Sequence, residues 1–369
     1  MSEAIPAALK EIFNQARIVH IASQMRAVHG SFDQPRFIAL ASEALDGKGI
    51  MQRLRHLAVC LHATLEMDFQ QALPLLRLLA PRIEHGFASM ILPEYVALFG
   101  LDEFDTAMEA LAFFTGFGSS EFAVRHFLQR DQARALAIME RWSKHDDAHV
   151  RRLASEGSRP RLPWSFQLKA LMADPSGTAA ILENLRADES LYVRKSVANH
   201  LNDISKDNAH LVLKRLASWD LNQRHSAWIA RHALRTLIKK GNADALALVG
   251  VTGAAAVELE GFSVSPAVIE LGQRIVIEAV LVSTSAQAQK LEVDYAVLYA
   301  RKSGQARKVF KFKQMMLKPQ ERRVMAISQT IRDFSTRKHH PGHHRIELLV
   351  NGVCLATAGF DLLDFQPAA

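Results

Sequence analysis

The spacing of apolar residues changes near residue 250, and this change constrains the fold more than any other feature of the sequence. Before it, apolar residues recur three and four positions apart, for example in residues 50–65, 69–83 and 131–144, as amphipathic helices require. After it, short runs alternate polar and apolar residues, which is typical of strands. The sequence therefore predicts a multidomain protein with a helical domain over residues 1–250 and a β domain over residues 251–369.

The helical part contains a repeat. Val-Arg-Arg at residues 150–152 recurs as Val-Arg-Lys at residues 193–195, an offset of 43 residues, and a looser echo relates residues 196–200 to residues 228–232. Helical repeats of roughly 30–47 residues stack into solenoids of the HEAT or armadillo kind, and the inner face of such a solenoid is an extended concave surface. We therefore expect an all-α HEAT-like-repeat solenoid that offers a groove rather than a deep pocket.

The C-terminal part is predicted to be an all-β immunoglobulin-like sandwich. Asn351-Gly352 between two apolar runs is a strong hairpin signal, and six or seven short strands in about 110 residues fit a sandwich of the immunoglobulin or fibronectin type. The chain lacks a Cys…Trp…Cys framework, which disfavours a true antibody domain. The alternating runs are residues 274–283, 290–300, 307–313, 322–330, 345–350 and 353–362.

The net charge of +7 is unevenly distributed along the chain. Residues 124–242 hold 21 Lys and Arg against 12 Asp and Glu, whereas residues 1–123 hold 9 against 14. A strongly basic middle suggests a polyanionic partner such as nucleic acid, although a solvated basic helix face gives the same count. In the β part, residues 301–313 carry six positive charges and no negative one. This run indicates either a hairpin that contacts a nucleic-acid backbone or an edge strand protected by lysines.

Cysteine usage and hydropathy indicate the compartment. Cys60 and Cys354 lie far apart in apolar runs and match neither a disulfide framework nor a zinc spacing. No run approaches the roughly 20 apolar residues of a membrane span, and the first residues lack the pattern of a secretion signal. We expect a monomeric cytoplasmic protein with no membrane partner, no cofactor and no metal. The four histidines of residues 337–345 are interpreted as a DNA-facing turn, since no nearby carboxylate or cysteine completes a metal site.

The stretch HVRRLASEGSRPRLPW contains the residues that point most directly to chemistry. Arg152, Arg159 and Arg161 bracket Glu156, and two prolines hold a turn that precedes Trp164. Arginines suit phosphate contacts, whereas phosphates repel a carboxylate, so the place of Glu156 among them needs a reason. Catalysis at a cationic or carbocation-like centre is one such reason. Taken singly, Glu156 is typical of a surface ion pair with Arg152, and Trp164 is typical of a core residue.

Two further carboxylates are candidates for the same site. Asp203 takes a comparable place in the next repeat, and Glu121 directly follows Ser119 and Ser120, one of which we expect to be a helix N-cap. Taken singly, Asp203 is typical of a solvated or capping residue. Glu121 is typical of the first turn of a helix, where the dipole favours a negative charge.

Three stretches resemble a known family. They are HVRRLASEGSRPRLPW, SSEFAVRHFL and VRKSVANHLNDISK, and they resemble the AlkC branch of the DNA alkylation repair family, whose members are HEAT-like-repeat DNA glycosylases. The resemblance covers residues 75–245 best and the other parts of the chain more loosely. One group in that branch also has a C-terminal immunoglobulin-like domain.

The resemblance implies a monofunctional hydrolase of the bacterial cytoplasm, associated with the nucleoid when acting. It would cut the N-glycosidic bond of N3-alkylated bases in duplex DNA during base excision repair, above all 3-methyladenine, with 3-methylcytosine as a further candidate. N3 alkylation makes the base cationic and a ready leaving group. What remains is to stabilise an oxocarbenium-like sugar and to direct a water to C1′, which carboxylates can do. Relatives in the family are thought to leave the base largely stacked.

The resemblance also assigns site residues. The catalytic residues would be Glu156, Asp203 and Glu121 near the deoxyribose, with Trp164 stacked on the sugar or the lesion. The other DNA-contacting residues of the helical domain would be Arg152, Arg159, Arg194, Arg231, Trp228 and Phe122. The basic run of the β domain adds Arg307, Lys308 and Lys311.

Two alternatives stay open at this stage. A non-catalytic HEAT-repeat scaffold could bind DNA or an acidic protein through the same basic face, but it would not need carboxylates beside a tryptophan. A glycosylase with lyase activity would need a lysine nucleophile in the groove. Lys195 is the lysine near the motif, and nothing in the sequence visibly activates it.

Overall fold

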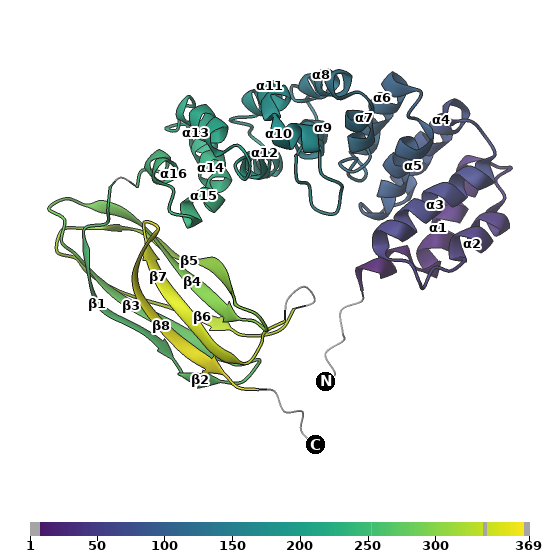
Figure 1. Cartoon of the computed structure of the whole chain (residues 1–369). Helices are drawn as coiled ribbons and strands as arrows, with labels where there is room; N and C mark the ends of the chain where they lie inside the picture. The colour runs from purple at the N-terminus through teal and green to yellow at the C-terminus, as the bar shows by residue number, and fades with distance from the viewer. Residues whose placement is uncertain (1–7, 252, 335–337, 365–369) are drawn as a thin grey trace. The chain divides into compact units, whose positions relative to one another are not determined.

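A computed structural model describes residues 8–251, 253–334 and 338–364, and it consists of a helical region followed by a β domain (Figure 1). The predicted fold class is confirmed. The chain divides into two compact units. Unit 1 comprises Met1–Asn208 and Asn222–Ala233, and unit 2 comprises Ala209–Leu221 and Leu234–Ala369. The domain division after residue 250 stays a prediction.

Unit 1 is built from short helices that pack in two rows (Figure 1). One row contains α3, α5, α9, α12 and α14, and in it α9 packs on α12 and α12 on α14. The helices are η1 (Leu9–Phe13), α1 (Gln15–Val28), α2 (Gln34–Ser42), α3 (Ile50–Leu65), α4 (Phe69–Leu79), η2 (Ala80–Arg82), η3 (Ala88–Met90), α5 (Ile91–Phe99), α6 (Phe104–Phe114), α7 (Val124–Arg130), α8 (Gln132–Trp142), α9 (Ala148–Gly157), α10 (Lys169–Ala173), η4 (Pro175–Thr178), α11 (Ala179–Asn184), α12 (Leu191–Ile204) and α14 (Arg224–Ala233).

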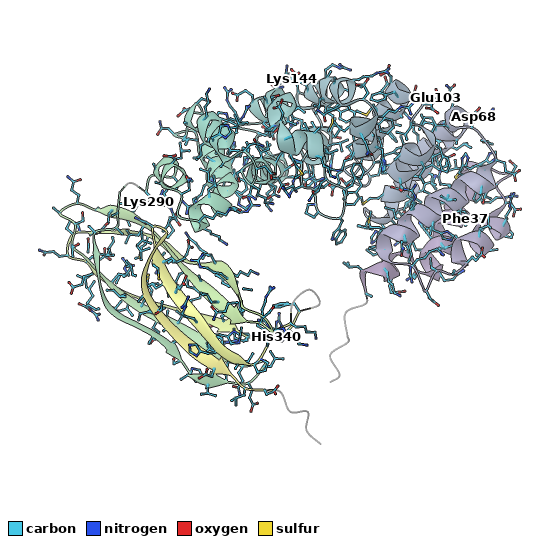
Figure 2. The ribbon with its side chains drawn as sticks, viewed as in Figure 1. Phe37, Asp68, Glu103, Lys144, Lys290 and His340 are labelled. Atoms are coloured by element: carbon cyan, nitrogen blue, oxygen red, sulfur yellow. The ribbon has the colours of Figure 1, made fainter. Side chains whose placement is uncertain are left out.

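The two rows differ in what they expose. Figure 2 shows the charged side chains of Asp68, Glu103 and Lys144 along the edge of unit 1 formed by α4, α6 and α8. The predicted site residues of the helical part lie elsewhere, on or next to α7, α9, α12 and α14. The Val-Arg-Arg and Val-Arg-Lys repeats belong to α9 and α12, which pack against each other as stacked helical repeats require.

Helix α9 forms where the sequence predicts it. Asp147 is the N-cap, and its carboxylate accepts a hydrogen bond of 2.8 Å from the backbone N–H of His149. Val150, Leu153 and Ala154 are buried, as the helical spacing requires. Gly157 ends the helix at a close approach to α7, because a Cβ atom there would lie 2.4 Å from Cγ1 of Val124.

We expect Gly157→Ala to destabilise the protein by about 1–3 kcal/mol, because the added methyl group must displace Val124 in a packed interior. Thermal unfolding followed by circular dichroism measures the effect. The matched control is Gly30→Ala, since a Cβ atom at Gly30 has no heavy atom within 4 Å. Equal melting temperatures for the two variants would contradict the close approach of α7 and α9.

Helix α7 begins later than the sequence predicts. It starts at Val124 with Ala123 as the N-cap, so the expectation that Ser119 or Ser120 caps this helix is wrong. The Ser120 hydroxyl instead donates to the backbone carbonyl of Leu111 at 2.8 Å, and the Ser119 hydroxyl donates to Glu121 at 2.8 Å. Glu121 therefore lies in a turn before α7 rather than in its first helical turn.

Unit 2 contains three helices and two β-sheets. The helices are α13 (Ala209–Ala217), α15 (Arg235–Lys239) and α16 (Ala243–Leu248), and the strands are β1 (Val257–Ser265), β2 (Val268–Ile269), β3 (Arg274–Ser283), β4 (Gln289–Ala300), β5 (Gln305–Leu317), β6 (Arg322–Thr330), β7 (Gly342–Val350) and β8 (Val353–Leu362). One sheet has the order β1-β3-β6 and the other β2-β8-β7-β4-β5. All neighbours are antiparallel except β2 and β8.

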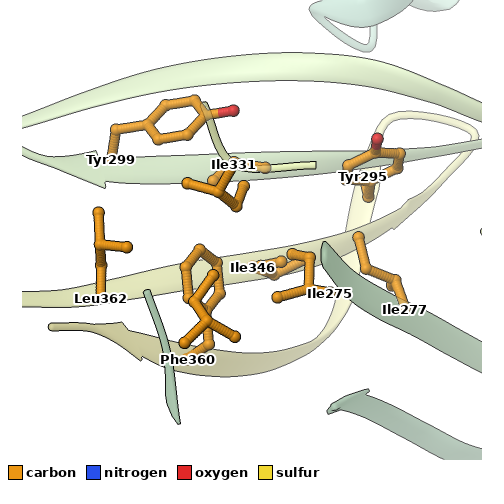
Figure 3. Close-up of a cluster of buried hydrophobic side chains, with 10 residues drawn as sticks. Ile275, Ile277, Tyr295, Tyr299, Ile331, Ile346, Phe360 and Leu362 are labelled. Carbon is orange, nitrogen blue, oxygen red and sulfur yellow. The ribbon is translucent and has the colours of Figure 1, made fainter. Parts of the chain in front are cut away.

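The two sheets share an apolar core, part of which Figure 3 shows. Ile275 and Ile277 come from the three-stranded sheet, and Tyr295, Ile346 and Phe360 come from the five-stranded sheet. All five are buried, which the alternation of apolar and polar residues in each strand predicts. Burial and, to a smaller extent, the neighbouring Tyr299 together raise the pKa of the Tyr295 hydroxyl to about 12.

The predicted Asn-Gly hairpin is present between β7 and β8. Asn351 and Gly352 both have positive φ angles, 49° and 82°, as the two central residues of a type I′ turn require.

None of the helices in the described part of the chain is long and apolar enough to cross a membrane.

Candidate active site

A cavity of about 410 Å³ opens in unit 1 where the turn before α7 meets α9, α12 and the loop after α9. Its wall is unusually aromatic for a surface that also carries charge. The lining includes the rings of Phe87, Phe117, Phe122, Trp164, Tyr192 and His149, together with the carboxyl group of Glu121 and the guanidinium of Arg152. The cavity therefore combines flat apolar surfaces with one carboxylate on its wall.

The carboxylate of Glu121 is held by Arg152 and Ser119. Arg152 Nη1 lies 2.8 Å from Glu121 Oε2, and the Ser119 hydroxyl donates to the same oxygen at 2.8 Å. The guanidinium of Arg152 also lies over the ring of Tyr192, 4.7 Å from its centroid, and 3.7 Å from Glu156. Burial lowers the pKa of Arg152, but the carboxylates of Glu121 and Glu156 raise it by more, so the net shift is upward. Arg152 is thus a permanent cation that faces two carboxylates.

Behind the cavity wall, Arg159 joins the other two predicted carboxylates. Its Nη1 donates to Glu156 at 2.6 Å, and its Nε donates to Asp203 at 2.9 Å. Glu156 is 6% exposed and Asp203 is 2% exposed, so the three groups form a buried ion-paired cluster. Lys206 completes it by donating to the second oxygen of Asp203 at 2.9 Å.

These ion pairs form a row of alternating charges that begins at the cavity wall and continues into the interior of unit 1. Its members, in order, are Glu121, Arg152, Glu156, Arg159, Asp203 and Lys206. Each buried carboxylate in the row contacts at least one guanidinium, which compensates the cost of removing its charge from water. Three of the four residues predicted as catalytic are therefore fixed in one network.

Trp164, the fourth, stands on the cavity wall in a strained conformation. Its side chain is 61% exposed, and its ring meets the ring of Phe87 edge to face at a centroid distance of 6.4 Å. Its φ angle is +66°, a region that costs a residue with a side chain about 1–3 kcal/mol. The tryptophan does not belong to the core. An indole that is both strained and exposed is typical of a binding or catalytic site.

We expect Trp164→Gly to leave the free energy of unfolding within about 1 kcal/mol of the wild-type value, because relief of strain offsets the greater freedom of glycine. The control is Trp142→Ala, which removes a buried indole from α8 and should cost about 3–5 kcal/mol. Chemical denaturation of both variants gives the comparison. A large loss of stability in Trp164→Gly would mean that the indole supports the fold.

The remaining helical candidates form a second cluster on α12 and α14. The guanidinium of Arg194 lies 5.8 Å from the ring centroid of Trp228, and its Nη1 donates to the carbonyls of Asp188 and Glu189. The ring of Trp228 stacks on that of His232 at 5.1 Å. Arg231 lies on α14 beside them. Of the predicted DNA contacts in unit 1, Phe122 and Arg152 line the cavity, whereas this cluster lies one repeat further along.

The basic run of the β domain is less strongly positive than its sequence suggests. Arg307 Nε donates to Glu347 at 2.9 Å, and Lys311 forms an ion pair with Glu292. Lys308 lies over the ring of Phe310, 5.1 Å from its centroid. All three basic residues belong to β5, and two of them pair with carboxylates of the same sheet, Lys311 with Glu292 of the adjacent β4 and Arg307 with Glu347 of β7. Their assignment to DNA binding stays a prediction.

The histidine-rich segment has carboxylate neighbours that the sequence did not reveal. Arg337, its first residue, lies outside the described residues. His343 Nδ1 is 3.0 Å from Asp361, and His339 Nδ1 is 3.4 Å from Asp333. Each of these two histidines thus has a carboxylate neighbour. Within the part of the chain that the structure describes, no group of three or more His, Cys, Asp or Glu side chains is arranged to hold a metal.

Several residues of the site were missed in the sequence, among them the cavity-lining Phe87, Phe117 and His149. Tyr192 lines the cavity, and its ring meets that of His149 edge to face at 5.4 Å. The offset of 43 residues relates His149 to Tyr192 and could have revealed this pair. Arg125 is fully buried in α7 and donates to the carbonyls of Gly157 and Arg159. Burial, followed by the charge of Arg159, lowers the pKa of Arg125 to about 10, so it stays protonated at neutral pH.

Taken together, the fold and the site define a HEAT-like-repeat protein with a buried carboxylate network at an aromatic cavity, joined to an immunoglobulin-like domain. Comparison with known proteins agrees with this description. The chain matches the family described as "DNA alkylation repair enzyme" over residues 115–237. It matches the family described as "Uncharacterised protein YhaZ, C-terminal Ig-like domain" over residues 258–364.

Two full-length relatives extend the match. The uncharacterised protein YhaZ of Bacillus subtilis (strain 168) is 40% identical over 360 residues, which cover 97% of this chain and 99% of that protein. A solved structure of Pseudomonas fluorescens alkylpurine DNA glycosylase AlkC, bound to DNA containing an abasic site analog, is 52% identical. It superimposes with a TM-score of 0.95 and covers 97% of this chain and 100% of that one. The chain therefore belongs to the DNA alkylation repair enzyme family, in its AlkC branch, and the predicted resemblance and enzyme class are confirmed.

Proposed function

We propose that the protein is a monofunctional DNA glycosylase that hydrolyses the N-glycosidic bond of cationic N3-alkylated bases in duplex DNA. Its main substrate is 3-methyladenine, and 3-methylcytosine is a further candidate. The AlkC structure supports this proposal, because that relative is an alkylpurine DNA glycosylase and its DNA contains an abasic site analog. An abasic site is what base removal leaves behind. DNA is accordingly the proposed partner, and the cytoplasm and the monomeric state are parts of the same proposal.

One observation supports a reaction rather than binding alone. Carboxylates repel DNA phosphates, yet Glu121 lies on the cavity wall beside Trp164, with Glu156 and Asp203 held behind it by arginines. Such carboxylates add nothing to the affinity for phosphates. The non-catalytic scaffold is therefore the weaker alternative.

The proposed reaction breaks the bond between C1′ and the base nitrogen. The alkylated base leaves with the bonding electrons and becomes neutral, so no acid is needed. The sugar becomes an oxocarbenium-like cation, which a nearby carboxylate stabilises electrostatically. A water then bonds to C1′ and gives up its proton to a carboxylate of the network. Trp164 stacks on the sugar or the cationic lesion.

In this proposal, the main role of Arg152 and Arg159 is to orient carboxylates and not to bind phosphates. Arg152 and Arg159 each contact two carboxylates, so we propose that they orient Glu121, Glu156 and Asp203 before they contact any phosphate. Phosphate contacts then fall mainly to other residues. These are Arg194 and Arg231 in the helical part and Arg307, Lys308 and Lys311 in the β domain, with Trp228 and Phe122 as aromatic contacts. The shallow cavity suits a lesion that stays largely stacked.

The most informative experiment incubates the protein with methylated duplex DNA and identifies the released bases by mass. The proposal predicts free 3-methyladenine and intact DNA strands, since a monofunctional enzyme leaves the abasic strand uncut. Strand cleavage would favour the lyase alternative with Lys195. Tight duplex binding with no released base would favour a scaffold.

A further inference from the structure

The loop that carries Trp164 has little internal structure of its own. It runs from Ser158 to Leu168 between α9 and α10 and contains no helix or strand. Within it, the backbone N–H of Leu168 donates to the carbonyl of Pro160 at 3.0 Å, and that of Ser165 donates to the carbonyl of Leu162 at 3.4 Å. A loop with so few internal bonds needs an outside partner to hold an exposed tryptophan at a positive φ angle.

Arg125 is that partner. Its side chain comes from α7, is fully buried, and reaches both ends of the loop. Nη1 donates to the carbonyl of Gly157 at 3.0 Å and to that of Arg159 at 2.7 Å, and Nη2 donates to the carbonyl of Phe166. The guanidinium also lies over the ring of Phe166, 5.4 Å from its centroid. One planar side chain thus joins the start of the loop to its end.

The same contact links the loop to the charged network. The carbonyl that Arg125 holds belongs to Arg159, whose own side chain contacts Glu156 and Asp203. A shift of the start of the loop would therefore move both Trp164 and the guanidinium that orients two carboxylates. Arg161, further along the loop, forms a bidentate, partly exposed pair with Asp207, which solvent screens more than it screens a buried contact. Arg125 is the stronger constraint because it is buried and makes three charge-assisted hydrogen bonds.

We propose that Arg125 is a positioning residue, which closes the Trp164 loop and thereby fixes the indole and the Arg159 bridge in the geometry that excision requires. The expected effect of Arg125 on excision rests on the proposed function. The closure of the Trp164 loop by Arg125 does not depend on it. A lysine cannot replace this arginine, because an ammonium on a flexible stem cannot donate to three carbonyls in one plane.

The first test needs no DNA. Trypsin cleaves after Arg161 only if the loop opens, and the products are identified by mass. We expect Arg125→Lys to be cut there at least about tenfold faster than the wild type, since the loop loses its closure. The matched control is Arg130→Lys, an exposed arginine of the same helix that pairs with Asp102. Equal cleavage of wild type and Arg125→Lys would overturn the proposal.

The second test is a double-mutant cycle on excision from methylated duplex DNA. We expect Arg125→Lys to lower kcat by about tenfold or more with a smaller change in KM, because misplacement by an ångström can cost that much. In a Trp164→Gly background the same substitution should cost clearly less, since the two residues act as a unit. Full additivity would mean that Arg125 supports only the general fold, and would overturn the positioning role.

The two tests distinguish a failure of the proposed function from a failure of the positioning role of Arg125. If the wild-type protein releases no base from any methylated duplex, the proposed function fails while the trypsin experiment still decides the closure of the loop. If Arg125→Lys does not fold, hydrogen exchange of the wild type decides instead. The backbone amide of Leu168 should then exchange with solvent as slowly as the amides of α9. Exchange at the rate of an open loop would overturn the proposal.

Discussion

Replacing Glu156 by Gln, or Asp203 by Asn, is expected to lower the excision rate by about 10²–10³-fold while leaving the affinity for duplex DNA nearly unchanged. Each substitution removes one negative charge and keeps the size of the side chain. The charge matters because it stabilises a developing positive charge on the sugar, whereas binding to phosphates gains nothing from it. Single-turnover excision and a DNA-binding isotherm on the same duplex give the two quantities.

The control for these variants is Asp207→Asn, which removes a carboxylate just after α12 that pairs with Arg161 outside the buried cluster. It should excise bases at close to the wild-type rate. Because Glu156 and Asp203 are buried, folding has to be checked by circular dichroism for each variant. An equal loss of excision and DNA affinity would indicate misfolding instead of a catalytic role.

Removing Arg159 is expected to have the largest effect on stability. Arg159→Leu leaves the buried carboxylates of Glu156 and Asp203 without their shared guanidinium, and breaking a buried ion pair in this way costs about 3–5 kcal/mol. Chemical denaturation measures the free energy of unfolding. The substituted leucine also removes the hydrogen bonds that orient both carboxylates, so excision should fall even at temperatures where the variant is folded.

Arg161→Leu is the matched comparison, two residues along the same loop. Its partner Asp207 is partly exposed, and surface ion pairs contribute at most about 1 kcal/mol. A loss of stability in Arg159→Leu no larger than in Arg161→Leu would contradict the buried three-residue bridge.

Much of the fold could be predicted because both periodicities are strong. The helix α3 has the bounds that the apolar spacing indicated, and the six predicted strands reappear as β3 to β8 with small differences at their ends. The start of α7 could not be predicted, since serine hydroxyls that look like caps bond instead to Leu111 and Glu121. Tertiary contacts decide which of several local hydrogen-bond acceptors a serine hydroxyl uses.

The sequence analysis named catalytic candidates that the fold brings together, but it did not predict their connections. Glu121, Glu156, Asp203 and Trp164 do gather around one cavity and the network behind it. The sequence suggested phosphate contacts for Arg159, because arginine suits phosphates and carboxylates equally well and spacing does not distinguish them. The offset of 43 residues aligns Glu156 with residue 199, so only the fold shows that Asp203 is the carboxylate that Arg159 reaches.

The central claim is that bases are excised at the cavity whose wall carries Glu121, and the single-turnover excision rate of Glu121→Gln on a duplex with one 3-methyladenine tests it most directly. We predict a rate at least about 100-fold below that of the wild type, with a DNA affinity that is unchanged or slightly higher because a charge that repels phosphates is gone. A rate equal to that of the wild type would contradict the account, since the reaction would then take place away from this cavity.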